Sequence, residues 1–349
     1  MTRFALATLA PAALLALAVL TGGAWGAAAL VWMTVLTFAL DRLGREAASP
    51  AAPGAEFPAG QTLSLTLAAA HLALWPLAIH GIGGDSGLGL AERAVAFFAF
   101  GLFFGQISNS NAHELIHAAP RWPRRLGALV YVSLLFGHHV SAHRLVHHVH
   151  VATDADPNSA RQGEGFWHFL PRAWAGSFRA GLAAETARRA RNRRGAHPYA
   201  LWIGGAALAL ALAWAIAGLP GLLTLLGLAG YAQVQLLLSD YVQHYGLRRA
   251  LRRDGRPEPV GPQHSWNAPH RQSSAMMLNA PRHSDHHAHP SRPWPALELD
   301  GATMPHLPQS LPVMAVIALW PPAWRALMDH RARRIADRRP TGAAAVKTG

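Results

Sequence analysis

The 349-residue sequence contains no cysteine, only one lysine (Lys347) and little charge, since 14% of its residues are charged. The lack of cysteine excludes disulfide bonds, thiolate metal sites, iron–sulfur clusters and cysteine nucleophiles. A tightly bound transition metal must therefore depend on histidine and carboxylate side chains. The low charge, combined with a hydrophobic content of 51%, is typical of a membrane protein.

The formal net charge of +13 comes almost entirely from arginine. The arginines lie between apolar runs and not on a separate domain with interleaved aromatic residues, which argues against nucleic-acid binding. We expect them to orient the chain in a lipid bilayer, because cytoplasmic loops of membrane proteins are rich in positive charge. Some of them are also suited to docking an acidic protein partner.

The apolar runs predict an all-α membrane protein with six transmembrane helices, near residues 4–20, 26–40, 63–80, 88–108, 200–219 and 222–238. Short turns near residues 21–26, 81–87 and 219–221 would join them into three hairpins. For the first run a cleaved signal peptide is the alternative, because Arg3 precedes it and small residues follow it. The second run begins almost at once, which favours a hairpin.

The distribution of positive charge predicts the topology. The three short turns contain no arginine or lysine, whereas the connections at 41–60, 109–199 and 239–349 carry nearly all of them. The positive-inside rule therefore places both termini and the histidine-rich regions 109–199 and 239–310 in the cytoplasm. We expect one membrane-embedded domain over residues 1–330, packed helices at 126–136 and 311–319, and a flexible tail at 331–349.

Histidine is unusually abundant, with 21 histidines against 18 acidic residues. Nine of them fall into four clusters, several with an i, i+3 or i, i+4 spacing that places rings on one face of a helix. All four clusters lie on the predicted cytoplasmic side and could meet in one volume. The nine residues are His113, His117, His143, His147, His148, His244, His283, His286 and His287.

The first cluster, His113-Glu-Leu-Ile-His117, matches the H-E-x-x-H pattern of zinc peptidases, in which Glu114 would be the catalytic base. One zinc ion accepts about four ligands, so nine clustered histidines fit two metal ions better. Imidazole suits iron, zinc and copper alike. A metal transporter would place its ligands along a path within the spans, whereas these clusters lie to one side. An intramembrane zinc peptidase remains a weaker alternative.

The segments HELIH, HRLVHHVHVATDADPNSARQGEGF, QHYGL and RHSDHHAHPSRPW, in this order, resemble those of the histidine-rich membrane di-iron desaturases and hydroxylases. The resemblance is closest to the bacterial alkane 1-monooxygenases and covers roughly residues 90–295. It implies a six-helix scaffold whose cytoplasmic helical cap holds two non-haem irons through the nine histidines. It also implies O2-dependent hydroxylation of the terminal carbon of medium- to long-chain alkanes, in the bacterial inner membrane.

The same resemblance implies that rubredoxin, with its reductase and NAD(P)H, donates the electrons. A rubredoxin module needs four cysteines, so the electrons must come from another protein. A fatty-acyl or lipid desaturase or hydroxylase and an alkyl-aromatic hydroxylase remain alternative activities. The chain also departs from the family pattern. Ala142 and Gln243 stand where the family has glutamate, and NAPRH replaces Leu-Gln-Arg-His.

Carboxylates beside the clusters are candidates to orient imidazole N–H groups without binding the metal. They are Glu114, Asp240 and Asp285, with Asp154 and Asp156 as further candidates that could equally cap a turn before Pro157. Aromatic residues on the spans could line a channel for an apolar substrate or simply pack. These are Trp75, Phe97, Phe98, Phe100, Phe103 and Phe104.

Overall fold

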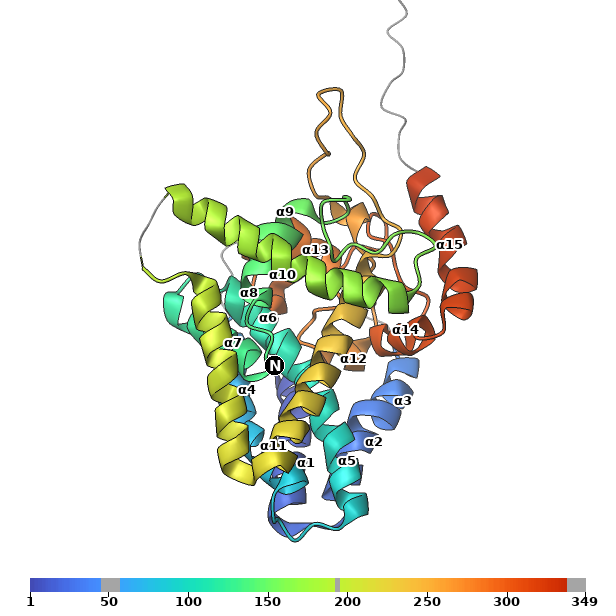
Figure 1. The fold of residues 1–349 in the computed structure, drawn as a ribbon. Coiled ribbons are helices and arrows are strands. Elements are labelled where there is room, and N and C mark those ends of the chain that lie inside the picture. Colours follow the sequence, from blue (N-terminus) through green and yellow to red (C-terminus); the bar gives the residue numbers. More distant parts are fainter. Residues whose placement is uncertain (45–56, 192–194, 338–349) are drawn as a thin grey trace, which may run out of the picture.

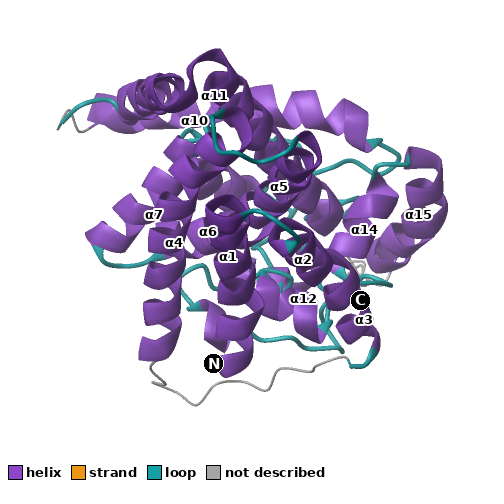
Figure 2. Cartoon of the chain, turned by 90° about the horizontal axis from the view of Figure 1, so that it is seen from below, coloured by secondary structure: helices purple, strands orange, loops and turns teal. Residues whose placement is uncertain are grey.

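The computed structural model describes residues 1–44, 57–191 and 195–337 (Figure 1). These residues form helices joined by loops, and Figure 2 shows no β-strand among them. The expectation of an all-α protein is confirmed for this part of the chain. The helices form a bundle at one end and a helical cap at the other.

The bundle contains all six predicted apolar runs. Its helices are α1 (Thr2–Thr21), α2 (Trp25–Val31) with η1 (Trp32–Leu36) and α3 (Thr37–Arg42), α4 (Pro58–Gly83), α5 (Leu90–Leu102) with η2 (Phe103–Ser108) and α6 (Asn109–His117), and α11 (Pro198–His244). Within the part of the chain that the structure describes, four helices, with Leu90–His117 counted as one, are long and apolar enough to cross a membrane. Many leucines on their outer sides are exposed, as on helices that face lipid.

Helix α11 holds the last two apolar runs and reverses direction at Ala217 and Gly218, where the backbone is not helical. The sequence placed this turn at 219–221. The reversal comes earlier because Gly218 adopts a φ of 58°, which glycine tolerates without strain, and Pro220 suits the first turn of the next helical segment.

The three chain reversals of the bundle lie together at the end opposite the cap (Figure 1). One hydrogen bond ties two of them, since the Gly23 N–H donates to the Glu92 carboxylate at 2.6 Å. The bundle is therefore built from three antiparallel hairpins, as the short turns predicted.

The cap comprises α7 (Arg121–Ser133), α8 (His139–Ala142), η3 (His143–His147), α9 (His148–His150), α10 (Phe166–Arg191), η4 (Pro262–His264), α12 (Arg271–Met276), α13 (His283–Ala288), η5 (Trp294–Ala296), α14 (Leu311–Ala318) and α15 (Pro321–Asp337). The helices predicted at 126–136 and 311–319 correspond to α7 and α14. Helix α15 continues through residues 331–337, the first part of the segment expected to form the tail. Residues 338–349 lie outside the described residues.

A buried carboxylate joins the bundle to the cap. Asp41, at the end of α3, accepts hydrogen bonds from the backbone N–H groups of Gln272 and Ser273 at 2.7 and 3.0 Å. These groups open helix α12 and would otherwise lack an intrahelical partner. The contact fixes α12, and the loop leading to α13, against the second apolar helix.

Candidate metal centre and adjoining cavity

The nine clustered histidines meet at the junction of bundle and cap in two adjacent groups. His113, His117, His143, His148 and His286 form the first, and His147, His244, His283 and His287 form the second. Within each group the candidate ligand atoms lie within 4.8 Å of one another. The two groups touch, because the rings of His148 and His287 are 4.6 Å apart. The structure thus brings together the nine histidines that the sequence singled out as candidates.

A π-helical turn, η3, decides how the histidines of the second cluster divide between the groups. The spacing of His143 and His147 predicted one shared face, but the segment between them is π-helical. The hydrogen bonds of a π-helix join residues five apart, so the wider turn brings His148 round toward the face of His143. Their Nε2 atoms are 2.9 Å apart, while His147 points into the other group.

The imidazole nitrogens converge as metal ligands do. In the first group, Nε2 of His143 lies 3.0 Å from Nε2 of His117, and Nε2 of His286 lies 3.1 Å from that of His148. In the second group, Nε2 of His283 lies 3.0 Å from that of His244. Tetrahedral ligands about 2.05 Å from a zinc ion would be about 3.3 Å apart, whereas ligands at right angles would be about 2.9 Å apart. Spacings of about 3 Å are compatible with nitrogens that share one metal ion.

Five of the cap histidines lie in surroundings that favour the neutral imidazole. Burial, reinforced by the neighbouring imidazoles, holds the pKa of these five well below the usual value; they are His143, His148, His283, His286 and His287. A neutral imidazole keeps a lone pair for a metal ion. Imidazole nitrogens are a donor set suited to a transition metal rather than to calcium or magnesium.

Asp156 orients one of these rings. Its Oδ2 atom accepts a hydrogen bond from Nδ1 of His147 at 2.8 Å, and both side chains are buried. Burial opposes a proton on His147, yet the carboxylate raises the pKa of this histidine above its usual value. With Nδ1 protonated, Nε2 has no hydrogen-bond partner among the described residues and faces the second group.

Asp156 also caps a turn, so both interpretations offered by the sequence apply to it. It accepts hydrogen bonds from the Asn158 N–H and the Ser159 hydroxyl at 3.1 and 2.7 Å. Asp154 differs, because its side chain is 82% exposed and lies 3.7 Å from Arg248. The side chain of Asp154 therefore faces away from the histidine groups.

The described hydrogen bonds of the other three candidate carboxylates are to groups other than the nine histidines. Glu114 accepts from the Trp294 N–H at 3.4 Å, and Asp240 accepts from the Asn158 side chain at 2.7 Å. Asp285 pairs with Arg292 and His289, both at 2.8 Å. Asp240 is nevertheless connected to the centre indirectly, because its partner Asn158 also donates a backbone hydrogen bond to Asp156. Glu114 and Asp285 instead hold the backbone and side chains around η5.

Gln243, one of the departures from the family pattern, has a bracing role. Its Nε2 donates to the Ala280 carbonyl at 3.1 Å, and its Oε1 accepts from Ser239 at 3.0 Å. It thereby ties α11 to the loop that precedes α13. Ala142, the other departure, is buried beside His143 and offers no polar group.

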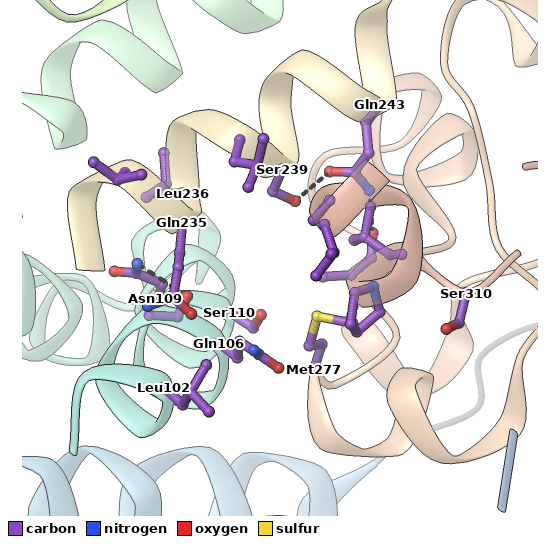
Figure 3. Close-up of a pocket in the computed structure, with 18 of the residues that line it drawn as sticks. Leu102, Gln106, Asn109, Ser110, Gln235, Leu236, Ser239, Gln243, Met277 and Ser310 are labelled. Carbon is purple, nitrogen blue, oxygen red and sulfur yellow. Dashed lines mark hydrogen bonds between the residues drawn. The ribbon is translucent and has the colours of Figure 1, made fainter. Parts of the chain in front are cut away.

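An apolar cavity of about 610 Å³ opens beside the centre (Figure 3). His113, His143 and His283 contribute to its inner wall, and η1, η2, α11 and α14 form its sides. Its lining includes Val35, Phe38 and Val316, all more than 45% exposed on the outer surface. An apolar molecule dissolved in lipid could therefore reach the histidines from the side. The six aromatic residues suggested by the sequence do not line it. Phe100, Phe103 and Phe104 are instead buried in the bundle core.

Comparison with known proteins places these features in a family. Residues 92–338 match the model of the fatty acid desaturase family. Alkane 1-monooxygenase 2 of Pseudomonas aeruginosa is 34% identical over 238 residues, which is 67% of this chain and 63% of that protein. Alkane 1-monooxygenase 2 of Alcanivorax borkumensis is 32% identical over 251 residues, 71% of this chain and 65% of that protein.

A more distant relative has a different named substrate. The hydroxylase component of xylene/toluene monooxygenase of Pseudomonas putida is 28% identical over 248 residues, which is 65% of this chain and 61% of that protein. The chain spans less than two thirds of the length of each of these three curated relatives.

Proposed function

The chain belongs to the fatty acid desaturase family, and on that premise we propose that it is a non-haem di-iron monooxygenase. Its reaction would insert one oxygen atom of O2 into the terminal C–H bond of a medium- to long-chain alkane. Two electrons and two protons would reduce the other atom to water. The alkane 1-monooxygenases among its relatives support this reaction. The observation that carries the proposal is the pair of histidine groups at the inner wall of an apolar cavity.

Each histidine group would hold one iron ion, the first through five imidazoles and the second through four. The fit rests on buried imidazoles, on ring nitrogens about 3 Å apart and on buried ring nitrogens without a partner among the described residues. Activation of dioxygen is the chemistry that bound iron supplies, and an unactivated C–H bond offers no handle for acid–base or nucleophilic side chains.

The protein's own groups perform binding and orientation. Asp156 keeps a proton on Nδ1 of His147 and so directs Nε2 toward the metal position. Asp240 would support the same region through Asn158. The apolar walls of the cavity bind the alkyl chain by removing it from water or lipid and present its end to the histidines.

The membrane arrangement is part of the same proposal. Six spans in three hairpins would place the cap, the centre and both termini on the cytoplasmic side of the bacterial inner membrane, as the distribution of arginine indicates. Reduced rubredoxin would deliver the electrons, resupplied by its reductase and NAD(P)H. The arginines around the cap would attract such an acidic partner.

Membranes containing the protein, supplied with rubredoxin, its reductase, NADH and octane, should produce 1-octanol. His286→Ala should abolish the product, and His80→Ala, an exposed histidine at the opposite end of α4, should not. Production of an alkene would indicate a desaturase, and oxidation of xylene but not of octane would indicate an alkyl-aromatic hydroxylase. The absence of any oxidised product across chain lengths would refute the proposal.

A further inference from the structure

The cap contains a second cavity, of about 570 Å³, which shares no described lining residue with the apolar cavity and includes none of the nine histidines. Its lining residues belong to the segments 263–266 and 301–306 and to the last turns of helix α15. In Figure 1 these turns of α15 point away from the bundle. The cavity therefore lies on the aqueous side of the cap, apart from the lateral route that lipid-dissolved molecules would take to the histidines.

Hydrogen bonds hold the walls of this second cavity in place. The Trp266 N–H donates to the Gln243 carbonyl at 2.7 Å, and the indole N–H of Trp266 donates to the Tyr245 carbonyl at 2.9 Å. The wall formed by 301–306 is tied to the same segment, because the Asn267 N–H donates to the Pro305 carbonyl at 2.8 Å. The cavity is therefore preformed, and its volume lies within the range of about 300–1,000 Å³ that is usual for small-molecule sites.

Two arginines of α15 give this cavity a positive charge. Arg331 and Arg334 both line it, and their i, i+3 spacing makes them neighbours on the helix surface. Neither makes an ion pair among the described residues, and the described hydrogen bonds of Arg331 are with the Leu327 carbonyl and the His330 ring. No described aspartate or glutamate lines the cavity. Because two like charges at this spacing repel each other, an anion bound between them would be stabilised.

Two carboxylates close to this cavity have other partners. Asp300, in the loop that forms one wall, accepts a hydrogen bond from the Thr303 hydroxyl at 2.6 Å. Asp329, on α15, accepts a hydrogen bond from the Tyr245 hydroxyl at 2.6 Å. Neither carboxylate belongs to the described lining of the cavity. The guanidinium groups of the two arginines are therefore available to a ligand.

The remaining lining residues indicate the chemical class of this ligand. The Gln263 side chain supplies further N–H donors, whereas Met304 and Ile335 offer apolar contact. A phosphate group carries about 1.5–2 negative charges near pH 7 and matches two arginines better than a carboxylate with one charge. We propose that this cavity binds a soluble organic phosphate, a phosphate monoester of the size of a nucleoside monophosphate, with its phosphate between Arg331 and Arg334. This inference goes beyond the proposed monooxygenase function and does not depend on it.

The test measures binding by calorimetry, with the iron-loaded protein in discs of zwitterionic phospholipid and with adenosine monophosphate (AMP), glucose 6-phosphate, adenosine and inorganic phosphate as probes. AMP should bind at one site per chain, and adenosine and inorganic phosphate should each bind at least about tenfold more weakly, because each lacks one part of the recognised group. Arg334→Gln should weaken AMP binding about tenfold through loss of a charge-assisted hydrogen bond. Its side chain is exposed and makes no described contact, so the fold should be unaffected. Arg253→Gln is the matched control, because it removes one exposed arginine outside the cavity, and it should bind AMP like wild type.

Four results would overturn this inference. Absence of binding by both AMP and glucose 6-phosphate would show that the cavity does not recognise phosphate monoesters. Equal affinity for AMP in Arg334→Gln and wild type would place any bound AMP elsewhere. Equal weakening in Arg334→Gln and Arg253→Gln would show that the overall positive charge of the cap attracts the anion. Inorganic phosphate that binds as tightly as AMP would show an ion site without recognition of the organic part. Since every readout is binding, failure of the proposed oxidation reaction would leave this inference standing, and failure of this inference would leave that reaction standing.

Discussion

Replacement of Asp156 by asparagine tests how the structure controls one metal position. Oδ2 of Asp156 accepts from Nδ1 of His147 at 2.8 Å and from the Ser159 hydroxyl at 2.7 Å. If the NH2 group of an asparagine took the place of Oδ2, its N–H groups would face the two donors, His147 Nδ1 and the Ser159 hydroxyl. Its oxygen could serve His147 only if the amide turned away from the Asn158 N–H. The ring of His147 would lose its fixed tautomer, and Nε2 would no longer be directed into the second group.

Loss of a carboxylate that orients a metal-bound histidine weakens metal binding about 10- to 100-fold, which corresponds to about 1.4–2.7 kcal/mol. Asp156→Asn should therefore lose iron from the second group first. Iron content after dialysis against a graded series of chelator concentrations would measure this change. Asp154→Asn is the matched control, because its exposed side chain lies two residues away and contacts arginine. Equal iron retention in Asp156→Asn and wild type would refute the reasoning.

Three further predictions concern the scaffold. Asp41→Ala should lower the free energy of unfolding by about 1 kcal/mol, because two N–H groups of α12 lose their cap, and thermal denaturation of purified protein would show it. Gly127→Ala should cost about 1–3 kcal/mol and reduce iron loading, because its Cβ would approach the Ala112 carbonyl to 2.9 Å. Gly204→Ala, which meets no atom within 4 Å, should not destabilise. The ion pair with Arg172 outweighs the effect of burial and lowers the pKa of Glu164 in the folded protein. The stabilisation that this ion pair gives the folded state should therefore be complete above the pKa of Glu164 in the unfolded chain, and it should decline as acid protonates Glu164. An Arg172→Leu variant with unchanged acid sensitivity would contradict that assignment.

The convergence of the nine histidines could be predicted because it depends on residue type and on spacing along the sequence. Histidine pairs at i, i+4 on helices such as α6 and α13 must share a face, so the convergence of these clusters needed only a fold that brings the helices together. The division into groups of five and four could not be foreseen. It depends on the π-helical turn between His143 and His147, for which the sequence carries no recognised signal.

The roles of the carboxylates were the least predictable feature. Sequence proximity suggested five carboxylates, Glu114, Asp240, Asp285, Asp154 and Asp156, and of these Asp156 makes the hydrogen bond to a histidine of the centre. Glu114 follows His113 directly, and a helical neighbour points about 100° away from it, toward Trp294. The hairpins were predictable from apolar runs and arginine-free turns. The position of the last turn was not, because it depended on the backbone freedom of Gly218.

The central claim is that two irons are held by nine histidines. Metal analysis of the purified protein, with iron and zinc counted per chain in the wild type and in variants of each group, tests it most directly. The account predicts two irons per chain, with His286→Ala and His244→Ala each weakening a different one. A content of one zinc per chain that is lost in His113→Ala and unchanged in His244→Ala would contradict this claim. It would favour the zinc-peptidase interpretation of the HELIH segment.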